Sequence, residues 1–207
     1  MPYGSFKIPK MSVDFVTKQI SGISTAKATG LDGISVILPK LTSYASVDIL
    51  TCVLNFSIET NNFENDWKRA KVSSIFKTGV EHMVNNYRLV SVLPIISKII
   101  EKHVINSFYE YLSENHLIAS SQSGFRPIHS CETAFDCLID RWLKNIDQGK
   151  LTGVLFIDLS KAFDTVNHNV LIHILKSFGI CENTVSWFKS YLSSREQNVG
   201  WKCFIKT

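Results

Sequence analysis

An aspartate, Asp158, ends a short apolar run in the stretch GVLFIDLSKAFDTVNH, which spans residues 153–168. The run at residues 154–157 is typical of a strand buried on both faces, and such a strand would hold the acid at one fixed point. Mg²⁺ prefers rigid oxygen ligands and is commonly bound by one or two carboxylates together with substrate phosphates. The pattern therefore points to metal-dependent phosphoryl transfer at Asp158.

Two other interpretations of this stretch have to be weighed. In a purely structural one, Asp158 ends a strand and Asp164, which follows Phe163, caps the next helix; matches to so short a motif often arise by chance. In the other, Asp158 is the nucleophile of a phosphatase, which would need a second acid two residues later. Position 160 is Ser160, so the phosphatase interpretation fails its simplest test.

Composition bounds the class of protein. The chain has 207 residues, 45% of them hydrophobic, and a net charge of +4. This is enough for one good-sized core or two small subdomains, and it excludes a disordered chain. Its five cysteines are widely spaced without a CxxC pair, as expected of reduced thiols. No apolar run approaches the length of a membrane span and no signal peptide is recognisable, so we expect a soluble intracellular protein of the nucleus or cytoplasm.

Helical periodicity and capping residues predict most of the elements. Ser12 is a plausible N-cap, Pro94 opens a long helix, and Ser130 precedes another. The expected helices span 12–21, 42–60, 131–148, 169–178 and 183–194, and the helix opened by Pro94 carries an apolar stripe from Ile96 to Leu112 and ends by Asn115. In the second of these, Ala45, Ile49, Val53 and Phe56 recur at helical spacing. We expect this stripe to pack as scaffold.

The segment WKRAKVSSIFKTG, residues 67–79, alternates apolar and polar residues as a half-exposed strand does, and Lys77 lies near its end. The segment YRLVSVLP, residues 87–94, reads as a second strand with Arg88 near its start. Paired as a hairpin, the two strands would place both cations at one end, a geometry suited to a triphosphate. Ordinary solvated surface charge is the alternative.

Four segments in this order resemble the reverse transcriptase domain of non-LTR (LINE-type) retrotransposons, and more distantly that of group II introns: WKRAKVSSIFKTG, NNYRLVSVLPIISKIIEK, QSGFRPIHSCETAF and FIDLSKAFDTVNH. KATGLDGIS, residues 27–35, also looks like the family's segment upstream of the fingers. The resemblance implies a helix-rich α+β fold that forms an incomplete right-hand polymerase, with the fingers and the beginning of the palm. Residues 1–66 would be an N-terminal helical extension, 67–150 the fingers and 151–207 the start of the palm, truncated before the paired-aspartate hairpin.

The resemblance also implies roles for single residues. Asp158 matches the first catalytic, metal-binding aspartate of the palm, and Ile157 or Leu159 would offer backbone to the metal. Phe163 matches the aromatic gate that excludes a ribonucleotide 2′-hydroxyl. The residues expected to bind nucleotide are Lys77, Arg88 and Phe163; those expected to lie against template or duplex are Gln122, Gly124, Phe125, Arg126, Lys68, Arg69 and Lys71.

The family's activity is RNA-directed DNA polymerisation, a nucleotidyl transfer. A primer 3′-hydroxyl joins the α-phosphate of a deoxynucleoside triphosphate on an RNA template, with two Mg²⁺ ions stabilising the attacking and leaving oxygens. The implied partners are therefore RNA template, DNA primer, deoxynucleoside triphosphates and the missing C-terminal palm and thumb, with no membrane.

Two features depart from the family pattern. Leu89 stands where the family usually has proline, and the family's other two active-site carboxylates are absent. We therefore expect this chain alone to be inactive. A catalytically dead nucleic-acid-binding fragment, or a decayed element, remains the alternative to an enzyme.

Overall fold

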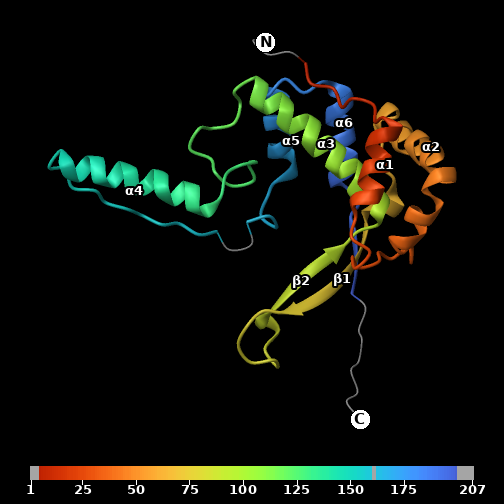
Figure 1. The fold of residues 1–207 in the computed structure, drawn as a ribbon, viewed down its shortest axis with the longest axis horizontal. Coiled ribbons are helices and arrows are strands. Elements are labelled where there is room, and N and C mark those ends of the chain that lie inside the picture. The colour runs from red at the N-terminus through yellow and green to blue at the C-terminus, as the bar shows by residue number, and fades with distance from the viewer. Residues whose placement is uncertain (1–4, 160–161, 200–207) are drawn as a thin grey trace. The chain divides into compact units, whose positions relative to one another are not determined.

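The computed structural model describes residues 5–159 and 162–199 (Figure 1). Within them lie six α-helices and one three-stranded sheet, so the fold is a helix-rich α+β fold. The chain forms two compact units: the larger unit comprises Met1–Tyr111 and His168–Thr207, and the smaller unit Leu112–Asn167. Each unit is described by itself below.

Helices α1 (Val13–Gly22) and α3 (Ile95–Glu114) pack side by side in the larger unit (Figure 1). The Ser12 hydroxyl accepts a hydrogen bond from the backbone N–H of Phe15, which confirms the predicted N-cap. The Phe15 ring meets the ring of His103 edge-on, with 5.2 Å between centroids. The predicted positions of both helices are thus confirmed to within a residue or two.

Helix α2 (Ile37–Glu59) has a different packing face from the one expected. Its buried positions are Val47, Thr51, Leu54, Ser57 and Ile58, whereas the predicted stripe, Ala45, Ile49, Val53 and Phe56, is exposed. The helix has apolar residues on both sides, and periodicity identifies a helix without telling which of two apolar faces is covered. The packing face we predicted is therefore wrong.

The same helix corrects the expectation that no segment is long enough for a membrane span. By length and composition alone, α2 could cross a membrane. Core helices of soluble proteins have these properties too, and α2 buries Leu54 and Ile58 in the core of the larger unit. Length and hydropathy therefore assign no membrane role to α2.

The predicted hairpin is confirmed. Strands β1 (Arg69–Phe76) and β2 (Tyr87–Val92) pair antiparallel, and β3 (Glu196–Val199) pairs parallel with the other side of β1. In β1 the side chains of Ala70 and Val72 are buried. Because side chains alternate along a strand, residues 69, 71, 73 and 75 lie on the opposite, solvent-facing side.

The glycine-containing loop at residues 27–35 lies against the junction of β2 and α3. A Cβ added to Gly30 would lie 3.0 Å from the backbone nitrogen of Pro94, so only glycine fits there without a shift. Gly33 has φ of +69°, and Asp32 accepts a hydrogen bond from the N–H of Ile34. One glycine thus allows a close approach and the other allows a turn.

An aromatic cluster lies at the base of the hairpin. Phe63 is fully buried, and the rings of Trp67, Trp187 and Tyr191 meet it edge-on at 5.0–5.5 Å. Trp67 belongs to the 3₁₀ turn η1 (Asn65–Lys68) just before β1, and the other two rings come from α6 (Glu182–Leu192). The cluster thereby joins the end of α2, the start of β1 and α6. Helix α5 (His168–Ser177) leads into α6, with Gly179 at φ +84° between them.

Helix α4 (Cys131–Asp147) is the main element of the smaller unit. The predicted cap is confirmed as a reciprocal capping box, in which Ser130 and Thr133 each bond the other's backbone N–H. Gly149, at φ +68°, follows the helix end, where glycine adopts the left-handed conformation without strain.

The predicted buried strand at residues 154–157 is wrong for the structure described. Residues 151–159 have no strand pairing, and the side chains of Leu155, Phe156 and Ile157 are 77–83% exposed. A strand buried on both faces needs neighbouring strands and covering layers, and no described residue pairs with this segment. The apolar run alone cannot supply those neighbours.

The buried His103 makes stability depend on pH. Its Nε2–H donates to the Pro9 carbonyl at 2.8 Å, yet burial lowers the pKa of its imidazole more than this bond raises it. As pH falls below about 6.5 the unfolded chain takes up the proton first, so stability is complete above that pH and is lost on acidification. Chemical denaturation between pH 7.5 and 5.5 should show this decline, and His103→Gln should reduce it. His82→Gln, which changes an exposed histidine, is the control. An equal dependence of the free energy of unfolding on pH in the unmodified protein and both variants would contradict the assignment.

Candidate functional site

Lys77 and Arg88 lie on one face of the hairpin. Arg88 is directly opposite Ile75, and the ladder continues one step beyond β1 because the Lys77 N–H donates to the Asn86 carbonyl at 2.7 Å. Directly opposed residues share a face, and so do residues two apart on one strand. Lys77 and Arg88 are therefore diagonal neighbours, opposite to the face that buries Val72.

The same face carries Arg69 and Lys71, two of the residues predicted to lie against template or duplex. Arg69 is ion-paired to Glu196 at 3.3 Å and to Asp66 at 4.0 Å. Lys71, Lys77 and Arg88 are exposed, and none of them forms a salt bridge within residues 5–159 and 162–199. The solvent face of the hairpin thus presents uncompensated positive charge that an anion can approach.

Lys68 lies apart from this set. Its side chain is buried, and its ammonium donates to the Asn65 side chain at 2.9 Å. Burial, with a smaller contribution from the charge of Arg195, lowers the pKa of Lys68. The structure therefore places this lysine inside, where it does not offer its charge to a polyanion.

Asn86 is a residue that sequence reasoning passed over. Its side-chain amide donates to the Val80 carbonyl at 2.9 Å and lies so close to Gly79 that an added Cβ would come within 2.6 Å of it. Tyr87 donates its hydroxyl to the Glu81 carbonyl at 2.9 Å. These contacts fold the connection between β1 and β2 against the strand end that carries Lys77. Two consecutive asparagines, Asn85 and Asn86, are a typical turn signal and were the available clue in the sequence.

In the smaller unit, Arg126 organises the loop predicted to lie against template. Its Nη1 donates to the carbonyls of Gln122 at 3.0 Å and Ala119 at 3.4 Å, and the Gln122 amide donates to the Gly124 carbonyl at 3.2 Å. Its Nε is buried without a hydrogen-bond partner among the described atoms. Arg126 thus supports the loop from within as well as carrying charge.

The structure brings two predicted site residues together. The rings of Phe125 and Phe163 meet edge to face, with 6.1 Å between centroids and 81° between planes, and both are largely exposed. Phe125 has φ of +60° and Ile128 has φ of +63°, a region that L side chains rarely adopt. Strained backbone of this kind clusters at functional sites. The predicted gate and the predicted template loop therefore share one exposed aromatic contact.

Asp158 is exposed between Ile157 and Leu159. It fits as one ligand of Mg²⁺, which uses few protein carboxylates and keeps waters or phosphates as its other ligands. In the described part of the chain, however, no three His, Cys, Asp or Glu side chains come together as a metal site. The residues thus fit a single ligand and do not form the complete centre that a pair of ions requires.

The capping role expected for Asp164 is wrong. Asp164 lies in the turn at 162–165, whereas α5 begins at His168, directly after Asn167. A cap has to adjoin the first helical residue. Asp164 therefore has no capping function.

The predicted site residues divide between the two units. Lys71, Lys77 and Arg88 belong to the larger unit, and Asp158 and the aromatic pair belong to the smaller one. In the larger unit the cations share one face of the hairpin, and in the smaller unit the contact shown is the one between Phe125 and Phe163.

Comparisons with known proteins identify the family of this chain. Residues 75–206 match the family model described as reverse transcriptase (RNA-dependent DNA polymerase). The chain is 27% identical over 198 residues to a probable RNA-directed DNA polymerase from transposon BS of Drosophila melanogaster, covering 92% of this chain and 21% of that protein. It is 26% identical over 206 residues to the RNA-directed DNA polymerase from mobile element jockey of the same species, covering 98% and 22%.

A third relative, a putative 115 kDa protein in the type-1 retrotransposable element R1DM of Drosophila melanogaster, is 26% identical over 194 residues, covering 90% of this chain and 18% of that protein. The chain thus spans about a fifth of the length of these curated relatives.

Proposed function

Because this chain belongs to the reverse transcriptase (RNA-dependent DNA polymerase) family and is related to the polymerases of non-LTR retrotransposons, we propose that it forms part of a right-hand polymerase. Residues 1–66 form an N-terminal extension, 67–150 the fingers and 151–207 the start of the palm. The whole protein extends a DNA primer on an RNA template.

The observation that carries this proposal is the hairpin face bearing Lys77 and Arg88. A triphosphate has closely spaced oxyanions, and hydrogen bonds to charged groups are stronger than neutral ones. The paired strands already hold the ammonium and the guanidinium as diagonal neighbours. Binding such a group therefore costs less conformational entropy than it would if the two side chains had to be brought together first. The match to the family model covers both residues.

The smaller unit supplies the remaining functions. Asp158 holds Mg²⁺ in the whole protein, and the metal supplies charge neutralisation at the phosphates. Phe163 excludes the 2′-hydroxyl of a ribonucleotide by steric clash. The loop supported by Arg126 lies against the template, with the exposed ring of Phe125 available for stacking on a base.

A second candidate is a nucleic-acid-binding fragment without catalysis. The uncompensated cations of the hairpin favour binding, while Asp158 belongs to no complete metal centre among the described residues. Such a fragment would bind RNA or an RNA/DNA duplex weakly and without sequence preference, and salt would weaken the binding.

Nucleotide binding by the hairpin is directly testable in this chain. Loss of a hydrogen bond to a charged group costs about 1.5–3 kcal/mol. Lys77→Ala with Arg88→Ala should therefore weaken deoxynucleoside triphosphate binding at least about 10-fold in isothermal titration calorimetry. The control removes two exposed cations elsewhere, Lys144→Ala with Lys189→Ala. Equal affinity in the two double variants would refute the assignment.

The gate is testable in the complete protein. Phe163→Val removes the aromatic ring proposed to clash with the 2′-hydroxyl. Relief of a clash of about 1.4 kcal/mol should raise ribonucleotide use relative to deoxynucleotide use by at least about 10-fold. The ratio of kcat/KM for matched ribo- and deoxynucleotides is the measurement. A folded variant with an unchanged ratio would show that Phe163 is not the gate.

A further inference from the structure

Helix α2 carries apolar side chains on the side that the core of the larger unit does not cover. Leu41 is 78% exposed, Ile49 68% and Phe56 59%. They belong to a row of six exposed residues, which we call the outer face of α2: Leu38, Leu41, Ala45, Ile49, Cys52 and Phe56. No member of the row is charged. Steps of three and four residues are typical of a helix face that packs against another element.

The opposite side of α2 is held by specific contacts. Asn55 exchanges two hydrogen bonds with the backbone of Met11, at 2.7 and 3.0 Å. The hydroxyl of the fully buried Ser57 accepts a hydrogen bond from the indole N–H of Trp187 at 3.3 Å. A rotation of α2 that turned its outer face inward would break these bonds and leave buried polar groups without partners. The core of the larger unit therefore cannot cover the outer face.

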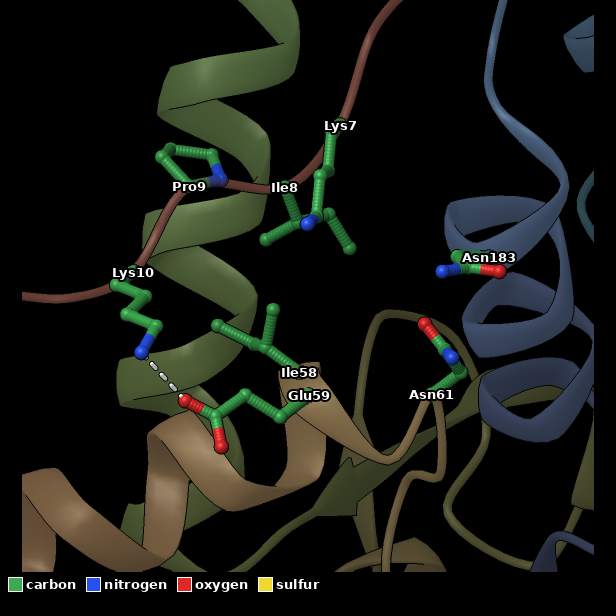
Figure 2. A pocket seen from close by; sticks show the side chains of 8 residues that line it. All are labelled: Lys7, Ile8, Pro9, Lys10, Ile58, Glu59, Asn61 and Asn183. Atoms are coloured by element: carbon green, nitrogen blue, oxygen red, sulfur yellow. Dashed lines mark ion pairs between the residues drawn. The ribbon is translucent and has the colours of Figure 1, made fainter.

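The charges of α2 do not favour a membrane surface as the occupant. Figure 2 shows the end of the helix, where the Glu59 carboxylate meets the Lys10 ammonium at 2.7 Å. Lys40 donates to the Ser21 carbonyl at 2.9 Å, and Asp48 is the only other charged residue of the helix. Helices that lie on a membrane are rich in Lys and Arg beside their apolar face. A helix with one lysine, already engaged, fits an apolar protein surface better.

The size of the outer face limits which protein surface can cover it. From Leu38 to Phe56 it is about 27 Å long, and at a helix width of about 10 Å it has an area on the order of 300 Å². Stable complexes of separate proteins bury about 800 Å² on each partner. The outer face alone is therefore too small to hold a second copy of this chain or a separate protein.

A segment of the same polypeptide needs less area. A tether keeps it near α2 at an effective concentration of about 1 mM, so that little freedom of translation is lost when the contact forms. The chain covers only 21% and 22% of two curated relatives. In a polypeptide of that length, most residues lie outside the 207 described by this sequence, and they can supply the covering segment.

We propose that in such a longer polypeptide an uncharged apolar helix from outside residues 1–207 packs lengthwise on the outer face of α2. Coverage from within the same molecule explains why the row is apolar along its whole length, although the core of the larger unit leaves it exposed. The proposal concerns none of the residues assigned to the nucleotide or template surfaces, and it does not require polymerase activity.

Cys52 reports the coverage of the outer face, because a thiol is alkylated only where the reagent reaches it. Alkylation by N-ethylmaleimide is followed by peptide mass spectrometry in residues 1–207 and in the complete protein. In residues 1–207, Cys52 should react nearly as fast as in the unfolded chain. In the complete protein it should react at least about 10-fold more slowly, since a contact open about a tenth of the time protects by that factor. A control thiol from Lys18→Cys, at an exposed position of α1, should react equally fast in both proteins.

A double variant tests whether the outer face itself carries the contact. Ile49→Gln with Phe56→Gln should restore fast alkylation of Cys52 in the complete protein. In residues 1–207 the same pair should leave the midpoint of urea unfolding unchanged, because both side chains are exposed there. The matched control, Val13→Gln with Ile105→Gln, changes exposed apolar residues elsewhere and should leave Cys52 of the complete protein protected.

Equal alkylation of Cys52 in the two proteins would overturn the proposal, as would slow alkylation already in residues 1–207. Protection that grows with protein concentration would overturn it in favour of a second copy. Protection that appears only with vesicles of phosphatidylcholine and phosphatidylserine would overturn it in favour of a membrane surface. The proposed function fails through a different measurement, the dependence of nucleotide affinity on Lys77 and Arg88, so the two failures are distinguishable.

Discussion

The position of the hairpin depends on burial of Phe63. Its ring is enclosed by Trp67, Trp187 and Tyr191, and the guanidinium of Arg195 lies 4.1 Å from the centroid of the Tyr191 ring. Edge-to-face and cation–π contacts of this kind fix relative orientation as well as contributing burial. The Tyr191 hydroxyl donates to Glu101 on α3 at 3.2 Å, and burial raises the pKa of Tyr191 to about 12. The hairpin is thus anchored to three helices at its base, while its cationic face stays free for ligand.

Sequence periodicity predicted those features that local interactions determine. The N-caps at Ser12 and Ser130 depend on residues within one turn, and the hairpin depends on two alternating segments joined by a turn. The register then places Lys77 and Arg88 on one face. Each of these consequences follows from neighbours in the chain, and each is present in the structure.

The predictions that failed concern long-range packing. Either apolar face of α2 satisfies the helical period, and only its neighbours decide that Leu54 rather than Phe56 is covered. The apolar run ending at Asp158 requires partner strands that its own residues cannot specify. Lys68 is charged, yet its place in the turn beside Trp67 takes it inside. Local pattern gives the type of an element, and tertiary contacts give its exposure.

We propose that Asp158 begins a polymerase active site whose chemistry needs further carboxylates than the described residues bring together. Primer extension on an RNA template tests it most directly, with the complete protein and residues 1–207 compared side by side. We expect templated extension by the complete protein, its loss in Asp158→Ala, its persistence in Asp164→Ala, and none from residues 1–207. Templated extension by residues 1–207, or by the complete protein carrying Asp158→Ala, would contradict it.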